Sequence, residues 1–335
     1  MARTCPGAVG TVSRVLPVSV EAYASHPLHS DGRVWAETNC SVDLWIEVLH
    51  SAGLDPRPAS AFVLATHFQG DQWSFLKHPP GDLRLLYGIT VEELNVWRPL
   101  LDHVESQLKE GRLLTVEADA WYLPDTRGTS YRQIHTKSTI VPNRVDRQSR
   151  SVEYFHGTGY WELSSADFVG IFPDSSLPSA SLPPYVELVN LDRLHTPTDH
   201  VGAALQLARD HFADRPSPCP VLPWRERLIA DLSWLKQQSR EVFHVYAFAM
   251  IRPCGGAAEL GADLLSWFSE NGCPAPESAR ADLERVAQLT KTLQFQLARL
   301  VSGRSVDILP LLDAVVSAWV RADEAMDEWF GQCGA

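Results

Sequence analysis

The sequence has no apolar run close to the roughly 20 residues that a membrane-spanning helix needs. The stretch MARTCPGAVGTVSRVLPVSV at its start lacks the continuous apolar centre of a signal peptide. No CxxC pair and no Cys/His cluster with zinc-ligand spacing occurs among the six cysteines, at positions 5, 40, 219, 254, 273 and 333. We therefore expect a cytoplasmic protein with no structural metal and no membrane partner.

Signatures of nucleotide-driven chemistry are missing as well. The sequence has no glycine-rich phosphate loop, no dinucleotide-binding fingerprint, no GxSxG elbow and no HExxH motif. The fragment GTGY at 157–160 does not follow the strand–turn–helix order that such motifs require. We expect neither ATP- nor NAD-driven chemistry, and no cofactor.

The apolar content that is present is sufficient for a large core. The chain has 335 residues, is 45% hydrophobic and contains 11 Trp, which excludes wholesale disorder and suits two packed units. Its net charge of −12 argues against broad, non-specific binding of nucleic acid, although a small basic patch remains compatible with it.

The two halves of the chain show different periodicities. Residues 1–195 read as α+β, with a helix at 40–52 and strand-like runs at 111–123, 134–142, 151–157 and 159–172. Residues 173–195 are rich in Pro and Ser and are typical of a linker or long surface loop. Helices are predicted at 198–214, 223–239, 241–252, 256–270, 277–302 and 307–330. We predict an α+β catalytic domain over 1–195 and an all-α helical bundle domain over 196–335.

Cys40 is the candidate nucleophile. It follows Asn39 at the start of the predicted helix, where unpaired backbone N–H groups and the helix dipole stabilise a thiolate. The alternative is a buried, inert cysteine.

His135 is the candidate general base, about 95 residues further on, at the start of a predicted strand. A cysteine at a helix start followed by a histidine on a later strand is typical of papain-like sites. The alternative is an ordinary strand histidine. The residue that would orient His135 is open, because the next strand offers only Glu153 and His156, and Asp146 lies in the turn before it.

Several polar residues are candidates for substrate binding. A carboxylate near the thiol would bind a substrate ammonium group; the candidates are Glu37, Asp71 and Asp119, together with Asn39 beside the nucleophile. Turn caps and solvated loop acids are the alternative.

Around His135 the charge is locally reversed, with one acid, Asp146, against the basic residues Arg127, Arg132, Lys137, Arg144, Arg147 and Arg150. This patch would suit phosphates of a tRNA acceptor end or of a carrier protein's phosphopantetheine arm; a solvated hairpin is the alternative.

Six segments occur in the order seen in a bacterial domain-of-unknown-function family: ETNCSVDLW (37–45), FQGDQWSFLKHP (68–79), ELNVWRPLLDHV (93–104), VEADAWYLPDT (116–126), IHTKSTI (134–140) and YFHGTGYW (154–161). The helical segment KTLQFQLAR (291–299) also fits, so the chain resembles this family over nearly its whole length. The family is similar to the BtrH-type acyltransferases of butirosin biosynthesis, which have a papain-like Cys-His core. It is also similar to the seryl-tRNA-dependent seryltransferase of valanimycin biosynthesis.

That resemblance implies a papain-like domain with Cys40 as nucleophile and His135 as base. Where the family has FHN, this chain reads FHG, so Gly157 replaces a possible orienting Asn and leaves a dyad assisted by His156. The function we expect is aminoacyl transfer, from seryl-tRNA or another aminoacyl-tRNA, to a small-molecule amine, hydroxylamine or hydroxyl acceptor. Three alternatives remain: transfer from an aminoacyl carrier protein, a cysteine hydrolase or peptidase, and a non-catalytic adaptor that docks carrier proteins.

Overall fold

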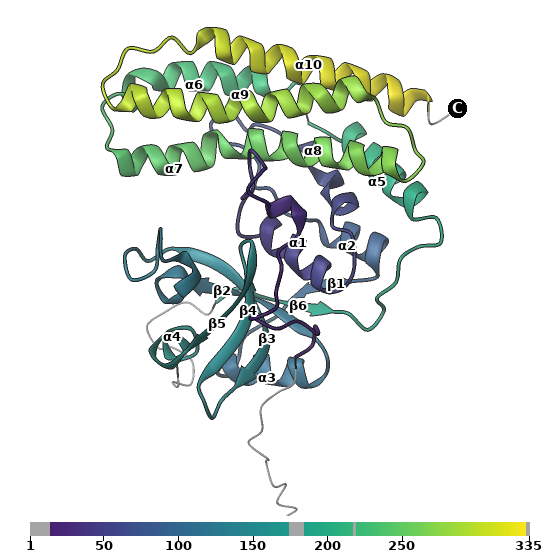
Figure 1. Cartoon of the computed structure of the whole chain (residues 1–335), viewed down its shortest axis with the longest axis vertical. Helices are drawn as coiled ribbons and strands as arrows, with labels where there is room; N and C mark the ends of the chain where they lie inside the picture. Colours follow the sequence, from purple (N-terminus) through teal and green to yellow (C-terminus); the bar gives the residue numbers. More distant parts are fainter. Residues whose placement is uncertain (1–13, 174–183, 217–218, 333–335) are drawn as a thin grey trace, which may run out of the picture. The chain divides into compact units, whose positions relative to one another are not determined.

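A computed structural model describes residues 14–173, 184–216 and 219–332, which form two compact units (Figure 1). The first, called the sheet unit, contains the described residues up to 27 together with Asp43–Leu54 and Leu83–Thr196. The second, called the helical unit, contains Leu28–Val42, Asp55–Asp82 and the described residues from 197 onward. The predicted division of the chain at 195/196 stays a prediction.

The sheet unit is built on a six-stranded sheet with the strand order β1-β6-β2-β3-β4-β5, in which every neighbouring pair is antiparallel (Figure 1). The strands are β1 (Thr90–Glu93), β2 (Leu113–Asp119), β3 (Lys137–Asp146), β4 (Ser151–His156), β5 (Gly159–Ser164) and β6 (Val186–Asn190). Its other elements are α3 (Leu100–Lys109), α4 (Ser165–Ile171) and the 3-10 turns η3 (Ala120–Tyr122) and η4 (Pro124–Thr126).

The predicted strands are found where β2, β3, β4 and β5 lie, but two segments differ from their predicted structure. The run 159–172 is a strand only to Ser164; Ser165 has a φ of 57°, and helix α4 begins there. The presumed linker contains β6, whose VELVN sequence pairs with β1 on one side and β2 on the other. Its β-branched residues suit a strand, and only the surrounding Pro and Ser concealed it. Residues 174–183 of that segment lie outside the described residues.

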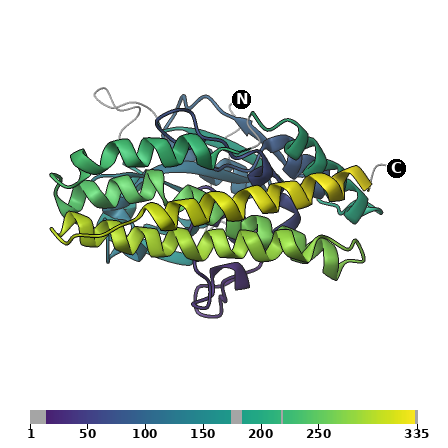
Figure 2. The same cartoon turned by 90° about the horizontal axis from the view of Figure 1, so that it is seen from above.

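The helical unit contains all six helices predicted after residue 196. They are α5 (His200–Ala213), α6 (Val221–Leu235), α7 (Arg240–Met250), α8 (Arg252–Glu270), α9 (Glu277–Val301) and α10 (Leu309–Gln332). Helix α9 packs between α8 and α10, and Figure 2 shows α9 and α10 side by side along their lengths. The cause is the predicted apolar stripe of α9: Leu283, Val286, Leu293, Leu297 and Leu300 are buried, and only Leu289 is partly exposed.

Shorter elements connect the units. Helices α1 (Val42–Ser51) and α2 (Pro80–Tyr87) each begin in the helical unit and continue in the sheet unit. The 3-10 helix η1 (Pro27–His29) begins in the sheet unit and continues in the helical unit. The 3-10 helix η2 (Arg57–Ala65) lies wholly within the helical unit.

Within the described residues, none of the helices combines the length and the apolar character that a membrane span requires.

Residues 28–42 belong to the helical unit because their side chains and backbone are bound to α8 and α9. The indole Nε1 of Trp35 donates to the carbonyl of Ala287 at 3.0 Å. Its ring lies over Gly255, where a Cβ atom would approach the indole to 2.1 Å, so only glycine fits there. Arg33 forms an ion pair with Asp263 at 2.6 Å. The segment that carries Cys40 is thus attached to the helices, although it is remote from them in sequence.

Candidate functional site

Cys40 lies at the N-terminus of α1, as predicted. The Oδ1 atom of Asn39 accepts hydrogen bonds from the backbone N–H groups of Ser41 at 2.8 Å and Val42 at 3.0 Å, which makes Asn39 the helix cap. The Asn39 amide nitrogen also donates to the carbonyl of Leu76 at 2.9 Å. Cys40 is half-buried and is not part of a disulfide. Asn39 therefore fixes the backbone on which the thiol stands, and its role in substrate binding stays a prediction.

The helical unit also carries two of the predicted substrate-binding acids. Glu37 is largely exposed and lies 3.6 Å from the guanidinium group of Arg252. Asp71 lines a hollow of about 500 Å³ whose walls include Trp234 and Tyr246. Cys40, Asn39, Glu37 and Asp71 thus belong to one unit, and contact of the acids with a substrate stays a prediction.

His135 belongs to the sheet unit and has a carboxylate partner. Its Nδ1 atom lies 2.6 Å from Oδ2 of Asp119, the last residue of β2. The other oxygen of Asp119 accepts the backbone N–H of Trp121 at 3.0 Å. The imidazole stacks on the Trp121 indole, with ring centroids 4.4 Å apart and planes 8° from parallel. The ring is therefore held on two sides, while two thirds of the His135 side chain stays exposed.

The chemistry of this pair follows from the ring nitrogen that it occupies. When Nδ1–H donates to a carboxylate, the neutral imidazole keeps the lone pair on Nε2, which is the tautomer that a general base needs. Asp119 and Lys137 are paired across β2 and β3, so the antiparallel register brings the end of β2 next to His135. Asp119, a predicted substrate-binding residue, is thus placed where it can orient the His135 ring.

His156, the predicted catalytic assistant, is buried in a separate polar network. Its Nδ1 bonds to Asp125, and its Nε2 lies 2.6 Å from the hydroxyl of Ser138. Asp125 also accepts a hydrogen bond from the hydroxyl of Tyr154. The order of atoms is that of a Ser-His-Asp triad, but Ser138 is 7% and His156 8% exposed. We interpret the network as an anchor that joins η4, β3 and β4; participation of His156 in catalysis stays a prediction.

The basic residues around His135 are largely matched by acids from other segments. Arg132 pairs with Asp167 of α4, and the ammonium group of Lys137 lies 3.0 Å from Glu117 of β2. Ion pairs likewise join Arg144 to Glu153, and Arg147 to Asp102 and Glu105. The guanidinium group of Arg127 instead lies over the ring of Tyr131, 5.7 Å from its centroid. The local excess of positive charge counted along the sequence is therefore much smaller in the fold.

The structure thus holds the two predicted catalytic residues in different units. The helical unit holds Cys40 on a capped helix terminus, and the sheet unit holds His135 on Asp119. The approach of Cys40 to His135 stays a prediction.

These features define an α+β protein with an all-helical C-terminal part, a helix-capped cysteine and an exposed His-Asp pair. The chain belongs to the DUF1839 family: the model of the DUF1839 N-terminal domain matches residues 24–191, and that of the DUF1839 C-terminal domain matches residues 198–328. Comparison with the curated proteins finds none that matches the chain.

Proposed function

We propose that this protein is a cysteine-dependent aminoacyltransferase, in which Cys40 is the nucleophile and the Asp119-oriented His135 is the base, in a papain-like arrangement. The observation that carries the proposal is the His135–Asp119 hydrogen bond, because it gives an exposed imidazole a fixed tautomer and orientation. The position of Cys40 directly after a helix cap supports it.

The reaction proceeds in two balanced steps. Cys40 loses its proton to Nε2 of His135, and its sulfur attacks the carbonyl carbon of an aminoacyl ester or thioester. The bond to the leaving alcohol or thiol breaks, the leaving group takes the proton from His135, and an aminoacyl thioester remains on Cys40. The acceptor amine, hydroxylamine or hydroxyl then attacks this thioester while His135 takes its proton. The carbon–sulfur bond breaks, and His135 passes that proton to the Cys40 sulfur. Because the donor is already activated, neither step needs a nucleotide.

The donor that we propose is an aminoacyl-tRNA, with seryl-tRNA as the first candidate from the resemblance to the valanimycin-type transferase. An aminoacyl carrier protein is the alternative. Ion pairs with acids of other segments occupy Arg132 and Arg147, so the donor has to be identified by a panel that contains both classes.

The test is to incubate the full chain with charged tRNAs and charged carrier proteins and to measure its intact mass. We expect a mass increase of one aminoacyl group, mapped to Cys40, that disappears on adding hydroxylamine as acceptor. Cys40→Ala should abolish the adduct, whereas Cys273→Ala, at another partly exposed thiol of the same unit, should keep it.

Two results would contradict the proposal. Transfer that persists in the Cys40→Ala variant would favour a non-catalytic adaptor or another nucleophile. Release to water that exceeds transfer to every added nucleophile would instead favour a hydrolase.

A further inference from the structure

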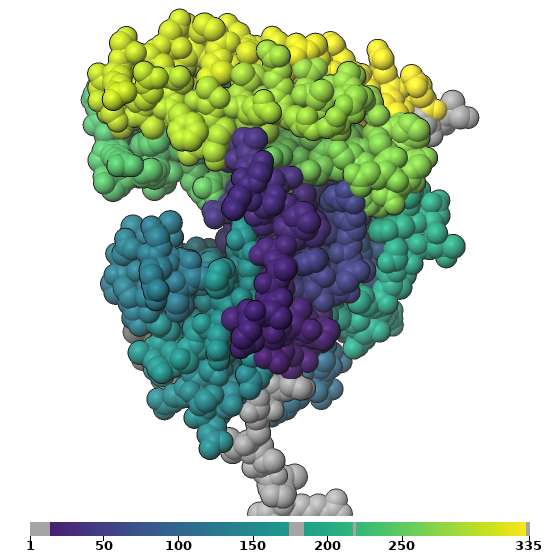
Figure 3. All heavy atoms as spheres, in the orientation of Figure 1, coloured from purple at the N-terminus to yellow at the C-terminus, as the bar shows by residue number. Residues whose placement is uncertain are grey.

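A second hollow lies in the sheet unit, and the described residues that line it include neither His135 nor Asp119. It has a volume of about 900 Å³ and lies between residues 14–24 (the N-terminal stretch), the end of α1 and β3. Its polar lining consists of Arg14, Arg144, His50, Ser19, Ser51 and Tyr23. Figure 3 shows the N-terminal stretch as purple atoms at the surface beside the teal atoms of the sheet. None of the described residues that line the hollow is Asp or Glu, although the protein has a net charge of −12.

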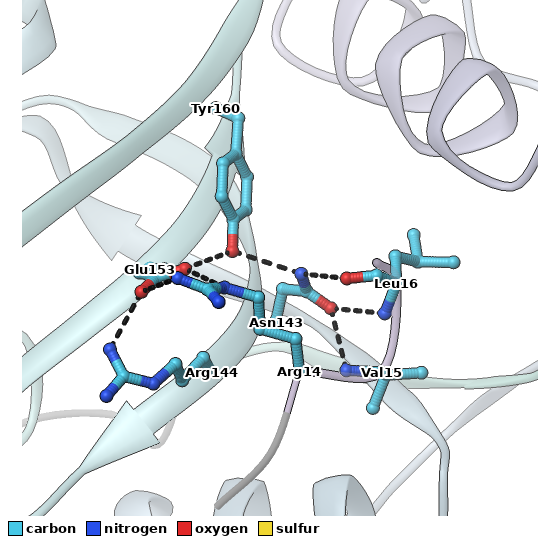
Figure 4. Close-up of polar contacts among 7 residues, drawn as sticks. All are labelled: Arg14, Val15, Leu16, Asn143, Arg144, Glu153 and Tyr160. Carbon is cyan, nitrogen blue, oxygen red and sulfur yellow. Dashed lines mark hydrogen bonds and ion pairs between the residues drawn. The ribbon is translucent and has the colours of Figure 1, made fainter. Parts of the chain in front are cut away.

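Both guanidinium groups are held in place by one buried carboxylate. Glu153 of β4 accepts hydrogen bonds from Arg14 at 2.6 and 2.7 Å and from Arg144 at 2.8 Å (Figure 4). Burial would by itself raise the pKa of Glu153, but hydrogen bonds from Arg14, Tyr160 and Arg144 outweigh it and hold that pKa below its usual value. Glu153 stays ionised and fixes the two arginines, each of which keeps further N–H bonds for a ligand.

The stretch that carries Arg14 is itself hydrogen-bonded to the sheet. The side-chain oxygen of Asn143 accepts the backbone N–H groups of Val15 at 3.1 Å and Leu16 at 2.7 Å (Figure 4). Its amide nitrogen donates to the carbonyl of Leu16 and to the hydroxyl of Tyr160, both at 3.0 Å. The position of Arg14 is therefore set before any ligand binds, which reduces the entropy cost of binding.

Two carboxylates that bond to lining residues of the hollow are buried. Glu153 is 4% exposed and saturated by its arginine and tyrosine partners. Glu47 of α1 is fully buried and bonds to the hydroxyl of Tyr23 and the backbone N–H of His26. The polar groups that line the hollow for an anion are therefore guanidinium, hydroxyl and imidazole groups.

We propose that this hollow binds the phosphate ester group of a nucleotide-sized ligand, with Arg14 and Arg144 as the phosphate-binding pair. Guanidinium groups form short, charge-assisted hydrogen bonds to phosphate oxygens, often two at a time. A volume near 900 Å³ accommodates an organic body as well as the phosphate. The site is separate from His135, because Lys137 and Arg144 are seven residues apart on β3, roughly 23 Å along a strand.

The proposed ligand carries a phosphate ester on an organic group. A mononucleotide and a phosphopantetheine group both have this chemistry. Calorimetry on the full chain would compare 5′-AMP and 4′-phosphopantetheine with adenosine, pantetheine and inorganic phosphate. We expect the phosphorylated compounds to bind in a salt-dependent way and the dephosphorylated ones not to bind. Whichever of the two phosphorylated compounds binds more tightly identifies the organic body.

Variants then locate the site. Arg144→Gln should weaken binding about tenfold or more, because it removes charged hydrogen-bond donors. Arg112→Gln, at an arginine of the same unit that pairs with Asp192 outside the hollow, should leave affinity unchanged. Cys40→Ala should bind normally, which separates this proposal from the proposed acyl transfer.

A second measurement needs no variant. Phenylglyoxal modifies accessible arginines, and the bound ligand should protect Arg14 and Arg144, but not Arg112, in peptide mapping of the unaltered protein. Three results would overturn the proposal. They are equal binding of adenosine and 5′-AMP, wild-type affinity in Arg144→Gln, and no protection of Arg14 and Arg144 by the ligand.

Discussion

The Nδ1 atom of His135 and the Oδ2 atom of Asp119 lie 2.6 Å apart, where the end of β2 meets the residues before β3. The imidazole is also stacked on Trp121, so its plane and its tautomer are both set by neighbours within one unit. An exposed histidine held in this way is preorganised to accept a proton on Nε2.

The first prediction concerns Asp119. Asp119→Asn should lower the rate of Cys40 acylation about 10²-fold, because the amide no longer stabilises the imidazolium or the required tautomer. Glu117→Gln, two residues earlier on β2 and paired with Lys137, should leave the rate nearly unchanged. Single-turnover acylation measures both. Equal rates in the wild type and Asp119→Asn would remove Asp119 from the account.

The second prediction separates two basic residues. Arg147 is occupied by Asp102 and Glu105, whereas Arg127 lies over the Tyr131 ring. If the donor is an aminoacyl-tRNA, Arg127→Gln should raise its apparent KM and reduce the salt dependence by about one released counterion. Arg147→Gln should change neither. If Arg127→Gln keeps the wild-type KM, Arg127 does not contact the donor.

The third prediction concerns the network around His156. His156→Ala should lower the free energy of unfolding by about 2–4 kcal/mol, because it leaves Asp125 and Ser138 buried without their partner. Ser149→Ala, at an exposed turn serine, should stay within about 0.5 kcal/mol. Urea denaturation gives both values. Because Ser138 is buried, a fluorophosphonate should not label it; labelling at Ser138 would show that the network is catalytic.

The fourth prediction uses pH. Both ring nitrogens of His78 are without a hydrogen-bond partner in the described part of the chain, and burial lowers the pKa of His78 to about 3. Since the unfolded chain has the higher pKa, it binds the proton first, and stability is lost as pH falls from about 6.5 toward 3. The loss should reach about 2 kcal/mol near pH 5.

The matching variant is His78→Leu, which removes the titrating group and should flatten the stability curve over that range. His195→Gln, at an exposed histidine, should keep the wild-type slope. Denaturant unfolding at several pH values decides between them. An unchanged slope in His78→Leu would mean that His78 is protonated as easily in the folded as in the unfolded chain.

The sequence was sufficient to predict the elements with strong periodicity. The apolar stripe of α9 and the β-branched and aromatic residues of β2 to β5 could be recognised because each pattern is local. Strand β6 was missed because five residues between Pro-rich stretches carry little signal. The packing of Trp35 against Gly255 could not be predicted, because nothing in the local sequence shows that this glycine admits the indole.

The candidate site was predictable as residue types but not as contacts. Cys40 after a capping Asn39 can be recognised from sequence, because the cap and the helix are adjacent. The Asp119–His135 pair depends on which strands are neighbours. The ion pairs of the basic residues around His135 depend on acids far away in sequence, such as Asp167 for Arg132. A charge count along one stretch cannot include such partners.

The central claim is that the Cys40 thiol and the His135 imidazole act on the same carbonyl group. The most direct measurement is cross-linking with 1,3-dibromoacetone, which alkylates a thiol and then a nucleophile within a few ångströms of it. The account predicts a bridged peptide that joins Cys40 to His135, absent from His135→Ala and retained in His156→Gln. Single attachment at Cys40, with no bridge to His135 under any condition that preserves transfer activity, would contradict it.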